Sequence, residues 1–185
     1  MTNGQPNTLH SPQIRAMSDS DLQAVLSLQQ RCYASAFHEP LAAFASKLQA
    51  APGSCWVLPS TLPGELMAYL VCLPVAPGAL PALHASDCPP PDEAAWLYVH
   101  DMAVAPEARG AGVAPQLLAQ AHAWARLAGL KALALVAVQD SQPFWSKQGF
   151  QSVPDALPAD KLASYGDGAC FMLQALDDVR TAQQT

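Results

Sequence analysis

Apolar residues recur along this chain at two different spacings, which separate expected helices from expected strands. From Leu22 to about Ala36 they return once per helical turn, after serine and aspartate residues that suit a helix N-terminus. Residues 41–50 predict a second helix, and residues 115–128 predict a longer one with an apolar stripe. We also expect a short helix over residues 141–148.

Other segments are apolar without helical spacing, and these predict strands. Residues 55–58 and 65–73 flank a Pro-Gly turn and predict a hairpin. Residues 96–104 predict a central strand, and residues 130–138 form an almost unbroken apolar run that suits a strand buried on both faces. The other expected strands cover residues 13–17, 150–153 and 169–176.

The order of these elements predicts one domain over residues 13–176, of the α/β (α+β) class with a mixed sheet. Its second half alternates strands and helices, so a right-handed crossover links two parallel strands. Residues 1–12 are expected to be a flexible lead because their polar composition gives no packed face, and residues 177–185 a C-terminal tail. The Pro-, Ala- and Gly-rich segment 74–93 is expected to be a long loop, either bordering a pocket or running over the surface.

The composition excludes several classes of function. Of 185 residues, 51% are hydrophobic and 13% charged, which does not fit disorder of the whole chain. The net charge of −6, with scattered basic residues, argues against a nucleic-acid partner. No apolar run predicts a membrane span and no secretory signal is visible, so we expect a cytoplasmic protein. Five cysteines without metal-ligand spacing predict free thiols and no metal site.

Two glycines, Gly110 and Gly112, lie between the predicted strand 96–104 and the predicted helix 115–128. Glycine tolerates positive φ and lets a ligand approach the backbone closely. The helix that follows offers unpaired N–H groups and the positive end of its dipole. Strand, glycine loop and helix N-terminus together predict a site for phosphate groups.

Two familiar nucleotide-binding patterns do not fit this loop. A dinucleotide fingerprint needs G-x-G-x-x-G and an acidic residue about 20 positions further on. Here Pro115 occupies the third glycine position and Asp140 lies too far along. The Gly-Lys-Ser/Thr of a Walker motif is absent from the chain. A dinucleotide-dependent reductase is therefore strongly disfavoured.

The segment Arg109-Gly110-Ala111-Gly112-Val113-Ala114 resembles the acyl-CoA loop of the GCN5-related N-acetyltransferase (GNAT) family, whose signature is Arg/Gln-x-x-Gly-x-Gly/Ala at a strand-to-helix junction. Val104-x-Pro106 before it and Phe144-Trp145-x-x-x-Gly149-Phe150 after it are also typical of that family. The resemblance spans roughly residues 96–150. It implies the GNAT fold, a mixed sheet of about six to seven strands flanked by helices.

The resemblance also implies a way of binding acetyl-CoA. The loop's backbone N–H groups would hold the CoA pyrophosphate, with a charge-assisted bond added by Arg109. The pantetheine arm would lie like an added strand in a gap where strand 96–104 splays from strand 130–138. The cofactor-binding residues implied in this way are Met102, Ala103, Val104, Arg109, Gly110, Ala111, Gly112, Val113, Ala114, Gln139, Ser141, Phe144 and Trp145.

Acetyl transfer to an amine needs a neutral amine, a polarised carbonyl and a protonated or stabilised thiolate. His100 and Asp101 are the candidate catalytic bases, of which at most one should face the acyl group because adjacent strand residues face opposite sides. The family often uses a tyrosine as acid where Trp145 stands here, and an indole N–H is not a usable proton source. Ser141 is the alternative donor, and Gln139 replaces an asparagine frequent in the family.

Weaker candidates lie elsewhere. His38 and Glu39, between the first two helices, would either border the acceptor site or form a solvated turn. Tyr98 shares a strand face with His100 and would line the pocket or pack against a helix. Glu93 stands at the entrance of the central strand, and the thiol of Cys170 is expected in the core.

The expected function is therefore an acetyl-CoA-dependent N-acetyltransferase without a metal. It would act by direct attack of a primary amine in a ternary complex, and the acceptor is an unknown small molecule or peptide. The alternative is a non-catalytic acyl-CoA-binding sensor or interaction module, because Trp145 replaces the family's tyrosine. The oligomeric state is left open, a homodimer being one option.

Overall fold

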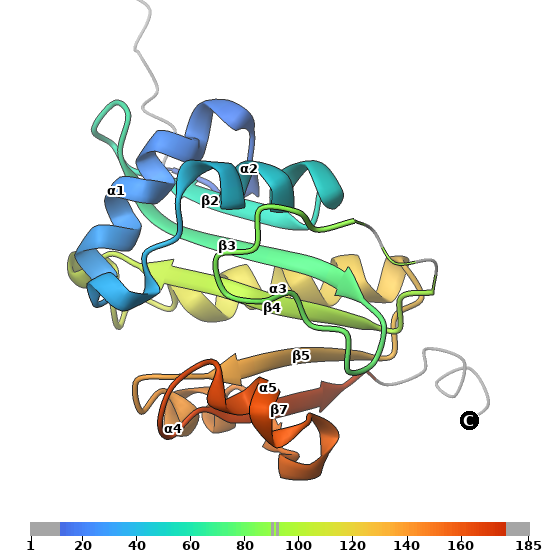
Figure 1. Cartoon of the computed structure of the whole chain (residues 1–185). Helices are drawn as coiled ribbons and strands as arrows, with labels where there is room; N and C mark the ends of the chain where they lie inside the picture. The colour runs from blue at the N-terminus through green and yellow to red at the C-terminus, as the bar shows by residue number, and fades with distance from the viewer. Residues whose placement is uncertain (1–11, 90, 92, 177–185) are drawn as a thin grey trace, which may run out of the picture.

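The computed structural model describes residues 12–89, 91 and 93–176, built around one seven-stranded sheet in the order β1-β2-β3-β4-β5-β7-β6. Helices α1 and α2 lie on one side of this sheet and α3 on the other (Figure 1). The strands are β1 Arg15–Ala16, β2 Cys55–Pro59, β3 Leu66–Val75, β4 Trp96–Val104, β5 Ala132–Ala137, β6 Gln151–Ser152 and β7 Cys170–Ala175. This arrangement is the mixed α/β sheet that the sequence predicts.

The helices follow the predicted apolar periodicity, with shifted ends. They are α1 Leu22–Cys32, α2 Leu41–Ala50, α3 Val113–Leu127, α4 Gln142–Lys147 and α5 Ala159–Ala163. The sequence predicts that the first helix extends to about Ala36, but α1 ends at Cys32 and a short 3₁₀ turn follows at Ser35–Phe37. Neither α5 nor the 3₁₀ turn Pro154–Ala156 was predicted. Residues 1–11 and 177–185, predicted as lead and tail, lie outside the described residues.

The apolar stripe of α3 explains how this helix packs on the sheet. Leu117, Ala121 and Ala125 are fully buried, and Gly129 ends the helix with φ of 71° as a left-handed residue just after its C-cap. Trp124, in contrast, is half-buried and Ala128 is exposed. The buried stripe therefore omits Trp124 and Ala128, which the apolar spacing of the sequence predicts to be buried.

The parallel strands β4 and β5 separate part-way along their length. They pair only from Trp96 to Tyr98 with Ala132 to Ala134, and residues 99–104 have no partner on β5. On its other edge β4 stays paired with β3 as far as Val104. The predicted splayed strand pair is therefore confirmed, and it leaves a gap at the carboxyl ends of the two strands.

A β-bulge interrupts β4 at the point where this gap begins. Asp101 pairs with Val71 and Val99 pairs with Cys72, so His100 is the additional residue of the bulge. A bulge breaks the strict alternation of side chains along a strand and re-aims them. It therefore changes which β4 side chains face the gap.

Candidate active site

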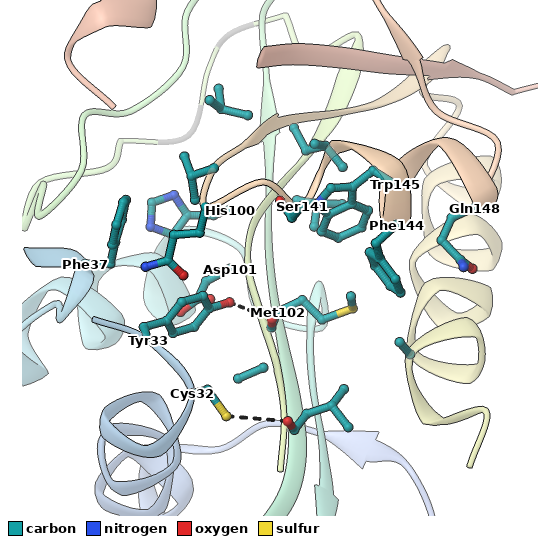
Figure 2. Close-up of a pocket in the computed structure, with 18 of the residues that line it drawn as sticks. Cys32, Tyr33, Phe37, His100, Asp101, Met102, Ser141, Phe144, Trp145 and Gln148 are labelled. Carbon is teal, nitrogen blue, oxygen red and sulfur yellow. Dashed lines mark hydrogen bonds between the residues drawn. The ribbon is translucent and has the colours of Figure 1, made fainter. Parts of the chain in front are cut away.

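A cavity of about 810 Å³ lies where β4 and β5 diverge. Figure 2 shows side chains from α1 and the segment after it, including Tyr33 and Phe37, on one side, and Phe144 and Trp145 of α4 on the other. Of the cofactor-binding residues implied by the sequence, only Ala111 is absent from the lining. Those that line it are Met102, Ala103, Val104, Arg109, Gly110, Gly112, Val113, Ala114, Gln139, Ser141, Phe144 and Trp145.

The glycine loop forms one end of the cavity. Gly110 and Gly112 have φ of 78° and 75°, values that side-chain-bearing residues rarely adopt. Gly112 is the N-cap of α3 and no side chain caps this helix, so the N–H groups of Val113 and Ala114 have no partner within it. A Cβ built at Gly110 would meet nothing within 4 Å. Open space beside an uncapped helix N-terminus fits a phosphate-bearing cofactor.

The edge of β4 that faces the gap presents backbone groups. Ala105 N–H donates to Met67 O on the β3 side, so alternation turns the backbone groups of Met102 and Val104 toward the gap. The Met102 carbonyl accepts a 2.6 Å hydrogen bond from the Tyr33 hydroxyl. The Val104 carbonyl accepts one from Arg109 Nε at 3.2 Å. An extended ligand arm would run along this edge.

Both candidate bases line the cavity, although strand alternation predicted that at most one would face the acyl group. The bulge at His100 is the physical reason, because two neighbouring residues of a bulged strand no longer face opposite sides. Figure 2 shows His100 and Asp101 in neighbouring positions beside Tyr33. Each of the two has its own set of partners.

The imidazole of His100 is bonded on one nitrogen only. Its side chain is 2% exposed, and Nε2 lies 2.9 Å from Oε2 of Glu39. Its Nδ1 is buried and, among the described residues, has no hydrogen-bond partner. A buried polar atom without a partner is unusual in a native fold and often marks a catalytic or binding role. The sequence makes His100 a candidate base but gives no sign of this asymmetry.

Glu39 carries a second buried ion pair. Its Oε1 lies 3.1 Å from Nζ of Lys47, and the two side chains are 2% and 0% exposed. The backbone N–H of His84 donates to the same oxygen at 2.7 Å. Burial acts to raise the pKa of Glu39, but the hydrogen bond from His100 and the charge of Lys47 outweigh it and lower that pKa to about 2. Glu39 is therefore ionised at neutral pH.

Asp101 is held by tyrosines. Tyr69 donates to its Oδ2 at 2.7 Å. Burial raises the pKa of Asp101, while the hydroxyls of Tyr69 and Tyr33 oppose that rise. Burial also keeps the pKa of both tyrosines well above the usual value, so they stay protonated as donors. Asp101 thus enters the cavity as a partly satisfied carboxyl group.

The opposite wall comes from the turn after β5 and from α4. Gln139 and Asp140 have φ of 51° and 57°, a left-handed conformation that costs energy for residues other than glycine. Ser141 is the N-cap residue of α4 and lines the cavity. Trp145 packs edge-on against Phe144 and Phe150, at centroid distances of 5.0 and 5.5 Å. No tyrosine comes from α4, so Trp145 forms an aromatic wall there.

Several residues of the candidate site are not evident from the sequence. Lys47 and Leu83 belong to no motif, and Tyr33 falls within the apolar stretch that predicts the first helix. Lys47 holds Glu39, whereas Tyr33 and Leu83 line the cavity. Tyr165 also lines it and bonds Tyr98, with 3.3 Å between the two hydroxyl oxygens. Only the folded structure reveals this set, because its members are far apart in sequence.

The weaker candidates divide in the structure. Glu39 lines the cavity, whereas His38 is outside the lining and its Nε2 lies 2.9 Å from the Tyr33 carbonyl oxygen. Glu93 is exposed and does not line the cavity. Cys170, expected in the core, is only partly buried, and its Sγ lies 3.1 Å from the Ser152 hydroxyl on the neighbouring strand. The long loop borders the cavity through Leu83.

Two further observations concern the described part of the chain. None of its helices is long and apolar enough to cross a membrane. It also holds no group of three or more histidine, cysteine, aspartate or glutamate side chains arranged to bind a metal ion. The five cysteines are free thiols.

Comparisons with known proteins agree with this geometry. A family model described as the acetyltransferase (GNAT) family matches residues 22–150. No curated protein sequence matches the chain. Among solved structures, the chain is similar to GphF, a GNAT-like decarboxylase in complex with isobutyryl-CoA, with a TM-score of 0.70, 21% identity, and 89% of this chain and 100% of that chain covered.

Two further solved structures have the same fold. The ribosomal-protein-S18-alanine N-acetyltransferase from Escherichia coli aligns with a TM-score of 0.60 and 18% identity, over 90% of this chain and 94% of that chain. Rv2747 from Mycobacterium tuberculosis, in complex with CoA and NLQ, aligns with a TM-score of 0.63 and 17% identity, over 90% and 100%. At such identities the likeness shows the fold alone.

Proposed function

Because this chain belongs to the acetyltransferase (GNAT) family, we propose that it transfers an acetyl group from acetyl-CoA to a primary amine of a small molecule or a peptide. One observation carries the proposal. A single cavity brings together an uncapped, glycine-flanked helix N-terminus and a buried imidazole nitrogen without a partner. The first suits the pyrophosphate of CoA, and the second suits a group that takes a proton.

Cofactor binding is assigned mainly to the backbone. The N–H groups of residues 109–114 bind the pyrophosphate, and the gap-facing edge of β4 at Met102 and Val104 bonds the pantetheine arm. When bound, acetyl-CoA supplies the acyl group as an activated thioester. Ala103, Gln139, Phe144 and Trp145 line the path of the arm. Since Phe144 and Trp145 are aromatic, they keep water away from it.

Proton transfer is assigned to His100. An amine must lose a proton as it attacks a carbonyl, and histidine titrates close to neutral pH. The unpartnered Nδ1 is the atom that accepts this proton. Asp101 lies beside it in the cavity wall and is the second group placed to bind the amine. Ser141, at the N-terminus of α4, is the proposed hydrogen-bond donor to the leaving sulfur, which Trp145 cannot protonate.

The acceptor end of the cavity favours an amine with an apolar neighbouring group. Phe37, Leu83 and Tyr165 line it. Its two carboxyl groups already have partners, Glu39 with Lys47 and His100, and Asp101 with Tyr69. Asp101 is then the carboxyl group left for the reacting amine, and the described lining holds no third one for a second positive charge on the substrate. Apolar primary amines and peptides with an apolar first residue should therefore be the better acceptors.

A turnover screen tests this function. Release of free CoA thiol from acetyl-CoA is followed over panels of amines and peptides, and thermal unfolding with CoA alone is measured in parallel. Amine-dependent thiol release supports the proposal. Stabilisation by CoA with no turnover of any amine would instead support an acyl-CoA sensor. Stabilisation by NAD(P)H and none by CoA would contradict the cofactor assignment.

A second readout separates acyl transfer from the activity named for GphF. Carbon dioxide release is measured from a CoA thioester whose acyl group carries a free carboxylate, with no amine present. The proposal predicts none. Amine-independent release of carbon dioxide, together with no acetylated amine, would assign decarboxylation to the same cavity.

A further inference from the structure

We propose that Glu39 is a positioning residue with two tasks: it fixes His100 in the form protonated on Nε2, and it holds the segment 81–85 against the acceptor end of the cavity. The catalytic meaning of the first task rests on the proposed function. The geometry of both tasks can be tested without turnover. Because one carboxylate does both, the base and the acceptor wall are coupled.

Glu39 lies where four separate segments meet. Only 4% of the residue is exposed. Its Oε2 faces His100 on β4, and its Oε1 accepts from Lys47 on α2 and from the backbone N–H of His84 in the long loop. Gln29 of α1 fixes the backbone of residue 39, with its side-chain amide bonding Glu39 N–H at 2.8 Å and Glu39 O at 3.1 Å. The carboxylate is therefore immobile as well as buried.

This arrangement determines the tautomer of His100. A carboxylate beside a buried lysine is ionised and can only accept hydrogen bonds. The hydrogen between it and His100 must then belong to Nε2. In a neutral imidazole the other nitrogen, Nδ1, carries the lone pair. The base role proposed for His100 depends on this lone pair, on an atom that is buried and has no partner among the described residues.

The same carboxylate fixes the acceptor wall. His84 has φ of 65°, a strained conformation that persists only where the surroundings hold it. Its N–H is bonded to Glu39, and the carbonyl of Ala85 accepts from Lys47 at 3.1 Å. At the start of the segment, the Pro81 carbonyl accepts from the Tyr165 hydroxyl at 2.9 Å. Leu83, between these anchor points, lines the cavity.

The first experiment uses the wild-type protein labelled with ¹⁵N-histidine. Nitrogen NMR near neutral pH shows which ring nitrogen carries the proton, and the His100 signals are those that disappear in His100→Gln. We expect the proton on Nε2, with a deprotonated Nδ1. A proton on Nδ1, or signals averaged over both tautomers, would overturn the inference whether or not an amine substrate is known.

The second experiment replaces the carboxylate by an amide, in Glu39→Gln. Two donors, Lys47 Nζ and His84 N–H, already claim the Oε1 position, so the amide oxygen stays there and its NH₂ group faces His100. An NH₂ donor needs a lone pair on Nε2 of His100, so the proton of the neutral imidazole moves to Nδ1. Nδ1 can then no longer accept a proton. We expect kcat/KM to fall by about 10²- to 10⁴-fold, as for loss of a general base. The pH profile of kcat/KM should also change from that of the wild type. CoA stabilisation should stay unchanged.

Gln29→Met is the matched control, because it removes two hydrogen bonds from the backbone of residue 39 and leaves its carboxylate in place. It should lower Tm yet preserve the ¹⁵N signature and the pH profile. Exchange of the amide hydrogens in segment 81–85, in which Pro81 has none, should accelerate in Glu39→Gln more than in Gln29→Met. Equal effects of the two variants on all three readouts would reduce Glu39 to a structural residue.

The two proposals fail separately. If wild-type protein acetylates no amine but His100 is protonated on Nε2 and exchange at residues 81–85 depends on the carboxylate, the proposed function is wrong and the positioning by Glu39 stands. If wild-type protein acetylates amines and Glu39→Gln keeps its kcat/KM and pH profile, the positioning role is wrong and the function stands.

Discussion

The two ends of the cavity are formed by different chemical groups, backbone N–H groups at one end and ionisable side chains at the other. At the cofactor end, the glycine loop and the start of α3 present backbone N–H groups. At the acceptor end, Lys47, Glu39 and His100 form a line of buried ionisable side chains. The first end depends on chain conformation, and the second depends on charge balance among buried side chains.

This difference predicts that the two ends fail in different ways. A backbone site has no group that titrates near neutral pH, so its disruption should cost ligand binding and little else. A buried ion pair contributes to folding through the balance of its charges, so removing one partner leaves a charge that water cannot reach. Variants at the two ends should therefore separate into binding defects and stability or catalytic defects.

The largest effect on stability is expected for Lys47→Met, which keeps the length of the side chain and removes its charge. Glu39 then stays buried with an uncompensated negative charge. We expect the free energy of unfolding to fall by roughly 3–5 kcal/mol, measured by urea unfolding at pH 7. Lys147→Met on the exposed face of α4 is the control, with a change within about 0.5 kcal/mol. Equal losses in both variants would show that the buried pair carries no special weight.

The second-largest effect is expected at acid pH, where the protein should lose the stability that ionised Glu39 contributes. The folded pKa of Glu39 is about 2, below its ordinary value of 4.5. A lowered folded pKa adds stability that is fully present above pH 4.5 and is lost as pH falls toward 2. This group should contribute roughly 3 kcal/mol. In urea unfolding at several pH values, the stability difference between wild type and Glu39→Gln should shrink over that window. A difference independent of pH would contradict the assigned ion pair.

Gly112→Val should affect the cofactor end instead. A β-branched residue cannot take φ of 75° without strain and brings bulk to the cradle. CoA at 100 times its Kd stabilises wild type by about 2.7 kcal/mol, and this gain should disappear in a thermal shift assay. Gly64→Val is the matched control, because Gly64 has φ of 76° in a turn outside the cavity lining. Gly64→Val should lower Tm by a similar amount and keep the full stabilisation by CoA. An unchanged CoA stabilisation in Gly112→Val would refute the pyrophosphate position.

The smallest effect is expected for Arg109→Gln. Its guanidinium is exposed and bonds the Val104 carbonyl, and the backbone N–H groups of the loop remain. We expect the Kd for CoA to rise by less than about tenfold, with the difference fading as salt screens the charge. Calorimetry at two salt concentrations measures it, with Arg126→Gln at the far end of α3 as control. A loss of CoA binding as complete as in Gly112→Val would show that the cofactor end depends on the charge of Arg109 and not mainly on backbone N–H groups.

The same contrast explains what was predictable from the sequence. The cofactor end is local, since Arg109 to Ala114 are neighbours and glycine spacing encodes their backbone conformation. The strands, α2 and α3 were predictable because their apolar periods are regular. Lys47, Glu39 and His100 meet only after folding, and each looks like an ordinary polar residue in its own segment. The bulge at His100 was equally invisible, because no glycine or proline marks it.

One variant tests most directly whether proton transfer and CoA binding belong to different ends of the cavity. In His100→Gln, the side-chain amide nitrogen can still donate to Glu39 from the place of Nε2, while the lone pair of Nδ1 is lost. Amine acetylation and CoA binding are measured on the same preparation. The account predicts that kcat/KM falls by about 10²- to 10⁴-fold while the thermal shift with CoA is unchanged. Undiminished turnover, or a parallel loss of CoA binding, would contradict it.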